Sequence, residues 1–170
     1  NTAPAIALAA LEAIANHESP KILVQTADHY IQDLEAFGSV VHEAFESEAP
    51  FVLFGVKPTY PETGYGYIEV GDARGKEFLV SSFQEKPDFK TAESFLKASN
   101  FLWNSGIFML EANAYLRALK MFEPAIYQAC KQAFNKASID LDFKRMDEKA
   151  FAESASISID YAVMERIQGL

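Results

Sequence analysis

Cysteine is almost absent from this sequence, which contains only Cys130 in 170 residues. A single thiol excludes an intramolecular disulfide. Cys130 lies within residues 125–136, a run typical of a helix, with no histidine nearby. We therefore expect a buried structural thiol and a cytoplasmic protein.

Histidine is scarce as well. His17, His29 and His42 have no metal-ligand spacing with Cys130, and no Gly-x-Ser-x-Gly segment is present. Zinc catalysis and serine hydrolysis are therefore poor candidates for the chemistry of this chain.

Long apolar runs and clusters of positive charge are missing too. The longest apolar stretch, residues 3–15, is interrupted by Glu12 and is too short to cross a bilayer. Acidic residues outnumber basic ones by 24 to 15, and the basic residues are scattered, which argues against a surface that follows nucleic-acid phosphates. We expect neither a membrane nor a nucleic acid as partner.

The pattern that is present alternates helices with strands in a single domain, residues 1–170. Thr2 is a good N-cap and Pro4 suits the first turn of an opening helix. Helices are expected at residues 3–15, 33–45, 91–98, 114–121, 125–136 and 158–167, and strands at residues 21–26, 51–56, 67–70, 78–83 and 107–110. The alternation predicts an α/β fold with a largely parallel sheet.

The chain opens on a helix, whereas doubly wound nucleotide-binding folds begin with a strand and a phosphate-binding loop. We therefore expect further residues before Asn1 in the intact protein, so that this domain is incomplete at its N-terminus.

Two acids follow or open predicted elements. Asp28 comes just after the strand at residues 21–26, and Asp160 lies in the first turn of the last helix. Together two carboxylates could hold one Mg²⁺, with water and substrate phosphate completing the coordination. The structural alternatives are an Asp turn that caps the next segment for Asp28 and a helix cap for Asp160.

Three further segments combine groups suited to a sugar phosphate. Gly66, within residues 63–67, would let a ligand approach the backbone, and Glu85 followed by Lys86 offers an acceptor for hydroxyls and a cation for phosphate. Asn104, in a predicted turn at residues 103–106, offers both a donor and an acceptor. Ordinary turns and a solvated charged pair would explain the same residues.

A family resemblance joins these motifs. Six segments, in order, carry it: residues 1–7, 27–29, 61–68, 83–87, 103–106 and 158–165. The chain resembles mannose-1-phosphate guanylyltransferases, which form GDP-mannose and pyrophosphate from GTP and mannose 1-phosphate. The resemblance implies a Rossmann-like nucleotide-diphospho-sugar transferase fold, in which helices cover both faces of a mixed, mostly parallel sheet.

The resemblance also implies site residues. In the family, the segment that corresponds to residues 1–4 lies beside the guanine base, and the acids that correspond to Asp28 and Asp160 hold Mg²⁺. The family residues that correspond to Gly66, Glu85 and Asn104 contact the sugar, and Lys86 would contact the phosphate of the sugar. The implied base-binding residues are Asn1, Thr2, Ala3 and Pro4, and the implied catalytic residues are Asp28, Lys86 and Asp160.

The sequence departs from the family in two places. No Gly-rich, basic loop for the GTP phosphates occurs in these 170 residues, so we expect this chain to be inactive by itself. Thr26 stands where the family usually has proline, two residues before the acid. Family members often carry a second domain that isomerises mannose 6-phosphate, and the sequence leaves that domain, the exact sugar and homo-oligomers open.

We expect an in-line displacement in which a sugar phosphate oxygen attacks the α-phosphorus of GTP, as part of polysaccharide biosynthesis. Three alternatives remain: transfer to another sugar 1-phosphate, a non-catalytic sugar-nucleotide-binding module, and a magnesium-dependent phosphohydrolase.

Overall fold

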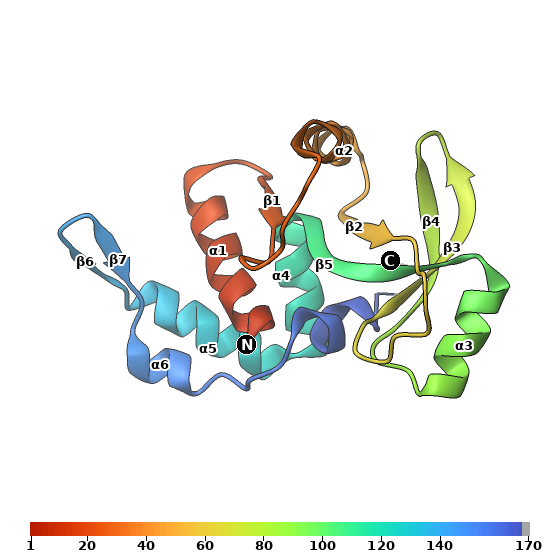
Figure 1. Cartoon of the computed structure of the whole chain (residues 1–170). Coiled ribbons are helices and arrows are strands. Elements are labelled where there is room, and N and C mark those ends of the chain that lie inside the picture. The colour runs from red at the N-terminus through yellow and green to blue at the C-terminus, as the bar shows by residue number, and fades with distance from the viewer. Residues whose placement is uncertain (168–170) are drawn as a thin grey trace.

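The computed structural model describes residues 1–167 and contains a five-stranded sheet, a two-stranded hairpin and surrounding helices (Figure 1). The helices are α1 (Thr2–Asn16), α2 (Leu34–Glu46), α3 (Phe89–Ala98), α4 (Ala112–Phe122), α5 (Pro124–Asn135) and α6 (Glu148–Ala152), followed by a π-helical turn, η1 (Asp160–Met164). The strands are β1 (Lys21–Val24), β2 (Phe51–Val56), β3 (Tyr67–Arg74), β4 (Glu77–Gln84), β5 (Phe101–Glu111), β6 (Ser138–Asp140) and β7 (Phe143–Arg145).

The long strand β5 organises the sheet. Phe108 pairs with Val24 of β1 and also with Leu53 of β2, so these two strands flank β5 on opposite sides. Trp103 pairs with both β2 and Tyr67 of β3, which places β3 on the same side as β1. The fourth strand in the chain, β4, pairs with β3 and forms an edge.

The expected α/β class is confirmed, but the prediction of a mostly parallel sheet is wrong for the described residues. Every strand pairing among residues 1–167 is antiparallel. The strands β1 and β2 do run in the same direction, as strand–helix–strand alternation predicts. They are not neighbours, however, because β5 lies between them and runs the opposite way.

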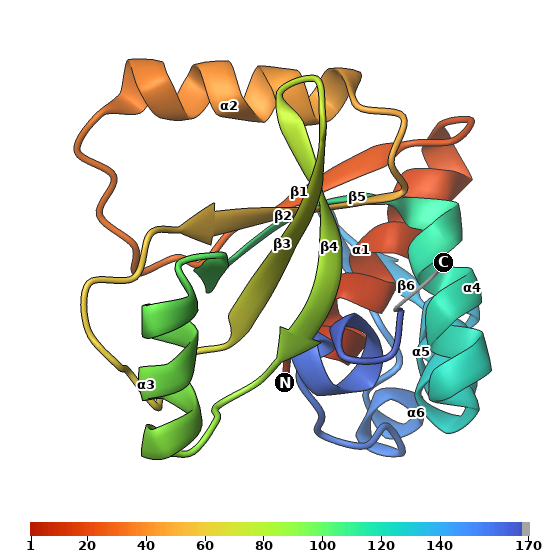
Figure 2. The same cartoon turned by 90° about the vertical axis from the view of Figure 1, so that its right-hand side faces the viewer.

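Helices cover both faces of the sheet, as expected (Figure 2). On one face, Phe108 and Leu110 of β5 join the main core together with α1, α4 and α5. Side chains of a strand alternate between faces, so the next residues point the other way. On that second face Phe54 of β2 contacts Phe37 of α2, with ring centroids 6.4 Å apart.

The first helix begins one residue earlier than expected. Asn1 is the N-cap, because its Oδ1 accepts a hydrogen bond from the Thr2 amide at 2.8 Å. Ala3, Ala7 and Ala10 are fully buried, and such small side chains let the α1 backbone pack closely against α4 and α5. The Thr2 hydroxyl is thereby free for another contact, described below.

The segment at residues 103–106 is not the predicted turn but the middle of β5. Trp103 is buried in a second, smaller core with Tyr67 and Ala92, which fixes the segment in the sheet. Gly106 has a φ of +72°, and the pairing with β2 shifts register between Leu53 and Gly55. The glycine therefore marks an irregularity within the strand.

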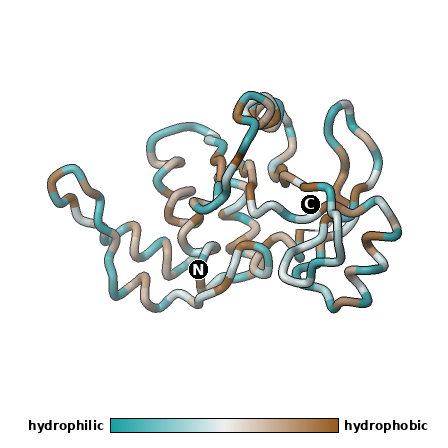
Figure 3. Tube along the Cα trace, in the orientation of Figure 1, coloured by the Kyte–Doolittle hydropathy of each residue, from teal (hydrophilic) through white to brown (hydrophobic). Residues whose placement is uncertain are grey.

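The short elements β6, β7 and α6 were not predicted, because runs of three, three and five residues are too short to show a periodicity. The expected final helix is only the short π-helical turn η1. Hydropathy along the chain varies from segment to segment (Figure 3), and no helix within residues 1–167 is long and apolar enough to span a bilayer.

Candidate active site

A cavity of about 840 Å³ lies between α2, the loop after β1, the end of β2 and the loop before β3. The residue after β4, the middle of β5 and the start of η1 complete its lining. Five predicted site residues line it: Asp28, Gly66, Glu85, Asn104 and Asp160. They come from five separate parts of the sequence, so the fold gathers them in a way that spacing alone cannot reveal.

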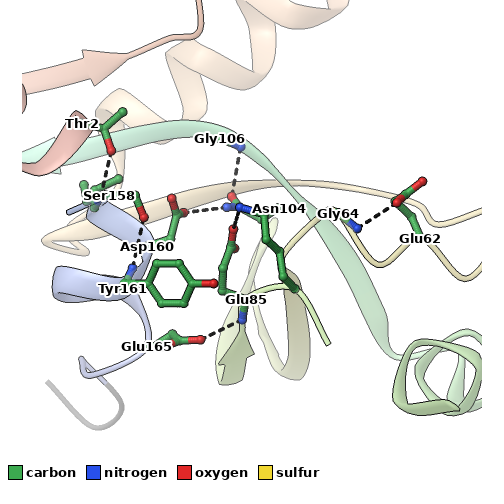
Figure 4. A network of polar contacts seen from close by, with 12 residues as sticks. Thr2, Glu62, Gly64, Glu85, Asn104, Gly106, Ser158, Asp160, Tyr161 and Glu165 are labelled. Carbon is green, nitrogen blue, oxygen red and sulfur yellow. Dashed lines mark hydrogen bonds and ion pairs between the residues drawn. The ribbon is translucent and has the colours of Figure 1, made fainter. Parts of the chain in front are cut away.

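Asn104 fixes the position of Asp160 (Figure 4). Its side-chain amide donates to Asp160 Oδ1 at 2.8 Å, and its Oδ1 accepts from the Gly106 amide at 3.0 Å. The Asn104 backbone amide donates to the Gly66 carbonyl at 2.8 Å. Burial raises the pKa of Asp160 above its usual value, and the hydrogen bond from Asn104 opposes that shift.

Glu85 has one oxygen engaged and one without a partner. Its side chain is only 8% exposed, and Oε1 lies 3.1 Å from the Lys86 ammonium. Oε2 is buried and has no hydrogen-bond partner among residues 1–167. Burial raises the pKa of Glu85, the charge of Asp160 raises it further, and Lys86 acts in the opposite direction. An unpaired buried acceptor of this kind is ready to bind a hydroxyl donor.

Gly66 leaves room for the Glu85 carboxylate. A Cβ atom at position 66 would lie 2.5 Å from Glu85 Oε2, 3.0 Å from Phe83 Cζ and 3.2 Å from Asn104 Cβ. Only a residue without a side chain therefore fits between these groups.

Lys86 lies at a sharp corner after β4. Its φ is +45°, a conformation that non-glycine residues rarely adopt, and its amide donates to the Tyr65 carbonyl at 3.2 Å. The side chain is about half exposed and pairs with Glu85, although it does not line the cavity itself. Glu85 raises the pKa of Lys86, so this ammonium stays charged.

Neither Asp28 nor Asp160 caps a helix, although capping was the structural alternative for both residues. Asp33 caps α2, because its Oδ1 accepts from the Ala36 amide at 2.9 Å, whereas Asp28 is exposed in the loop before it. Ile159 is the N-terminal flanking residue of η1, and Asp160 points to Asn104 instead.

The four predicted base-binding residues lie outside the cavity lining. Ala3 and Pro4 are buried in the core, where their carbonyls accept from Tyr115 Oη at 2.8 Å and Cys130 Sγ at 3.6 Å. The Thr2 hydroxyl accepts from the Ile159 amide at 2.9 Å, so Asn1 and Thr2 adjoin the segment that carries Asp160. Their contact with a base stays a prediction.

Sequence reasoning missed two features of the site. Glu165 accepts a hydrogen bond from the Glu85 amide at 2.9 Å; it belongs to the motif at residues 158–165, but nothing in the motif assigned it a partner. Tyr60 and Tyr65 both place their rings edge-on to Trp103, with centroids 5.0 and 5.5 Å away. Neighbouring aromatic residues in the sequence were the only available signal.

Comparison with known proteins gives the family. The profile of the family described as "Nucleotidyl transferase" matches residues 1–150. The chain is 49% identical over 168 residues to the xanthan biosynthesis protein XanB of Xanthomonas campestris pv. campestris, covering 98% of this chain and 36% of that protein. It is also 49% identical over 170 residues to the mannose-1-phosphate guanylyltransferase of Salmonella muenchen, covering 97% of this chain and 36% of that protein.

Solved structures agree on the fold. A Helicobacter pylori mannose-6-phosphate isomerase superposes with a TM-score of 0.85 at 34% identity, covering 98% of this chain and 64% of that one. A Thermus thermophilus structure described as a mannose-1-phosphate geranyltransferase also gives 0.85, at 32% identity, covering 98% and 47%. The chain thus spans little more than a third of the curated relatives' length, and it belongs to the nucleotidyl transferase family.

Proposed function

We propose that this chain is part of a mannose-1-phosphate guanylyltransferase, which transfers GMP from GTP to mannose 1-phosphate and releases pyrophosphate. The observation that carries the proposal is the cavity on which Asp28, Gly66, Glu85, Asn104 and Asp160 converge. The names of relatives with close to half of their matched residues identical support the same activity.

The sugar half of the site follows from the unpaired acceptor. Glu85 Oε2 is buried without a partner among the described residues, and a sugar hydroxyl would supply the missing donor. Lys86, held beside Glu85, would contact the phosphate as a point charge. Asn104 would orient Asp160 and, in the same position, border the bound sugar.

The reaction is an in-line displacement. A phosphate oxygen of mannose 1-phosphate attacks the α-phosphorus of GTP, the bond to the β-phosphate breaks, and pyrophosphate leaves. Because the attacking oxygen is already anionic, no general base is required, and the chain contributes mainly by positioning the reactants.

Asp28 and Asp160 would hold Mg²⁺, which neutralises charge on the phosphates when it is bound. The donor set fits this ion, because both residues line the cavity and offer carboxylate oxygens, the hard ligands that Mg²⁺ prefers. Within residues 1–167 no group of three His, Cys, Asp or Glu side chains forms a metal site. Mg²⁺ needs no such group, because it is commonly held by one or two carboxylates together with water and phosphate oxygens.

Several expectations remain part of the proposal. Guanine would lie beside Asn1 and Thr2, which adjoin Asp160 through the Thr2–Ile159 hydrogen bond. A cytoplasmic location is supported by the use of a single cysteine. A second, isomerase activity and a homo-oligomer in the intact protein stay open.

The decisive experiment measures pyrophosphate release by the intact protein with Mg²⁺ and mannose 1-phosphate, comparing GTP with ATP, UTP, CTP and dTTP. Release with GTP alone is the expected result. Release with another nucleotide would overturn the base assignment, and binding of GDP-mannose without any release would favour a non-catalytic binding module.

Asp28→Asn and Asp160→Asn should each lower the release rate by at least about 100-fold. The matched control is Asp33→Asn. Asp33 lies in the same loop as Asp28, but it caps α2 and does not line the cavity.

A further inference from the structure

The side chain of Glu165 bridges two parts of the site that are far apart in sequence. Its Oε1 accepts from the Glu85 backbone amide at 2.9 Å, a contact across 80 positions that is partly buried. Glu85 and Lys86 form the corner after β4. Because Lys86 adopts a left-handed conformation that is unfavourable for a non-glycine residue, surrounding contacts must stabilise this corner. Glu165 supplies one such contact.

The π-helical turn explains why Glu165 can reach this corner. In an α-helix, residues five apart point about 140° away from each other. In η1 the Glu165 amide donates to the Asp160 carbonyl at 3.0 Å, five residues back, so these two residues lie one above the other. Both side chains therefore face the same corner of the site (Figure 4).

The position of Glu165 also has an electrostatic cost. Asp160 and Glu165 both act on the Glu85 carboxyl as like charges, and burial already disfavours its ionised form. A hydrogen bond to a charged acceptor is stronger than one to a neutral acceptor, which offsets part of this cost. The contact therefore holds the backbone at residue 85 even though it disfavours the charge on the Glu85 side chain.

We propose that Glu165 is a positioning residue for the sugar-phosphate half of the site: carried on the same π-helical turn as Asp160, it fixes the backbone of the Glu85–Lys86 corner through its hydrogen bond. It does not touch the substrate. It acts through Glu85 and Lys86, and it links their position to that of Asp160. The inference rests on the guanylyltransferase function proposed above.

Two substitutions separate reach from charge. Glu165→Gln keeps the length of the side chain and an oxygen that accepts from the Glu85 amide, but removes the charge. Glu165→Asp keeps the charge but shortens the side chain, so that the acceptor no longer reaches. Glu93→Ala is the control, because Glu93 is an exposed acid whose ion pair with Lys97 lies on α3, away from the cavity.

The experiment measures kcat and KM for mannose 1-phosphate and for GTP, together with the thermal unfolding midpoint, in the intact protein. Glu165→Asp should raise KM for mannose 1-phosphate by about tenfold while KM for GTP stays within about twofold. Glu165→Gln and Glu93→Ala should keep both KM values within about threefold of the parent.

Each other outcome overturns a defined part of the argument. Equal impairment of the Gln and Asp variants would mean that an acceptor of the right length is not sufficient, which would overturn positioning through the hydrogen bond alone. A rise in both KM values, or unchanged kinetics in Glu165→Asp, would remove the positioning role alone. A parent protein that neither uses nor binds mannose 1-phosphate would overturn the proposed function, and this inference with it.

Discussion

Gly66→Ala tests the geometry of the proposed sugar pocket with a single methyl group. Gly66 does not have a positive φ, so the backbone accepts alanine and the whole effect is steric. The new Cβ would lie 2.5 Å from Glu85 Oε2, closer than non-bonded atoms approach one another. Because the Glu85 side chain is 8% exposed and paired with Lys86, it cannot swing freely into solvent.

The expected magnitude follows from overpacking. Forcing an extra methyl group into a packed site typically costs about 1–3 kcal/mol. Part of that cost is relieved by displacing the Glu85 carboxylate, which is the group proposed to bind the sugar. We therefore expect a free energy of unfolding lower by about 1–3 kcal/mol and a KM for mannose 1-phosphate raised by about tenfold or more.

Urea unfolding and steady-state kinetics check the two effects. Gly38→Ala is the matched control: nothing lies within 4 Å of its added Cβ, and Gly38 is inside α2. It should stabilise the protein by up to about 1 kcal/mol and leave kinetics unchanged. If Gly66→Ala matches the parent in both stability and KM, the tight approach of Gly66 to Glu85 is not a feature of the protein in solution.

Three further substitutions separate stability from function. Burial raises the pKa of Asp160 above its ordinary value of 3.8, so the folded state binds the carboxyl proton more tightly than the unfolded state does. The protein therefore loses stability as the pH rises from the ordinary pKa through the raised one. Asp160→Asn should therefore exceed the parent in stability above this pH window but not at low pH, in urea unfolding at several pH values, while pyrophosphate release falls. Asp28→Asn changes an exposed side chain and should leave the free energy of unfolding within about 0.5 kcal/mol while release also falls; a large loss of stability would contradict its assignment. Tyr115→Phe removes the buried hydrogen bond to the Ala3 carbonyl and should lower the free energy of unfolding by about 1 kcal/mol without changing KM for mannose 1-phosphate. An unchanged free energy of unfolding would show that this bond contributes nothing to stability.

The sequence predicts local structure well where apolar residues follow one another without interruption. The strand β2 has the bounds expected from its apolar run, and α1 differs from its prediction by one residue at each end. The direction of strand pairing was beyond reach, because β5 enters between β1 and β2 from a distant part of the chain. The segment around Asn104 looked like a turn because Asn, Ser and Gly favour turns, and the burial of Trp103 overrides that preference.

The site shows the same limit. The motifs predict Glu85, Asn104 and Asp160 as site residues, since their residue types suit a sugar phosphate and a cation, and all three line the cavity. The Asn104–Asp160 and Glu85–Glu165 hydrogen bonds span 56 and 80 positions, so only the fold reveals them. Asn1 and Thr2 illustrate the reverse case, in which a motif predicts a role that the cavity lining does not include.

The carboxylates of the site explain why two damaging substitutions should move stability in opposite directions. Burial disfavours the ionised forms of Asp160 and Glu85, the charge of Asp160 adds to the effect on Glu85, and Glu85 Oε2 has no donor among the described residues. In the absence of ligands the ionised carboxylates therefore lower the stability at pH values above their raised pKa values, and Asp160→Asn removes one of these charges. Gly66→Ala crowds the same cluster without removing any charge, so it should destabilise the protein. Both changes should weaken catalysis. If the cluster served only the fold, both substitutions should destabilise the protein. If it is a binding site for a cation and sugar hydroxyls, Asp160→Asn should stabilise the protein and Gly66→Ala should destabilise it.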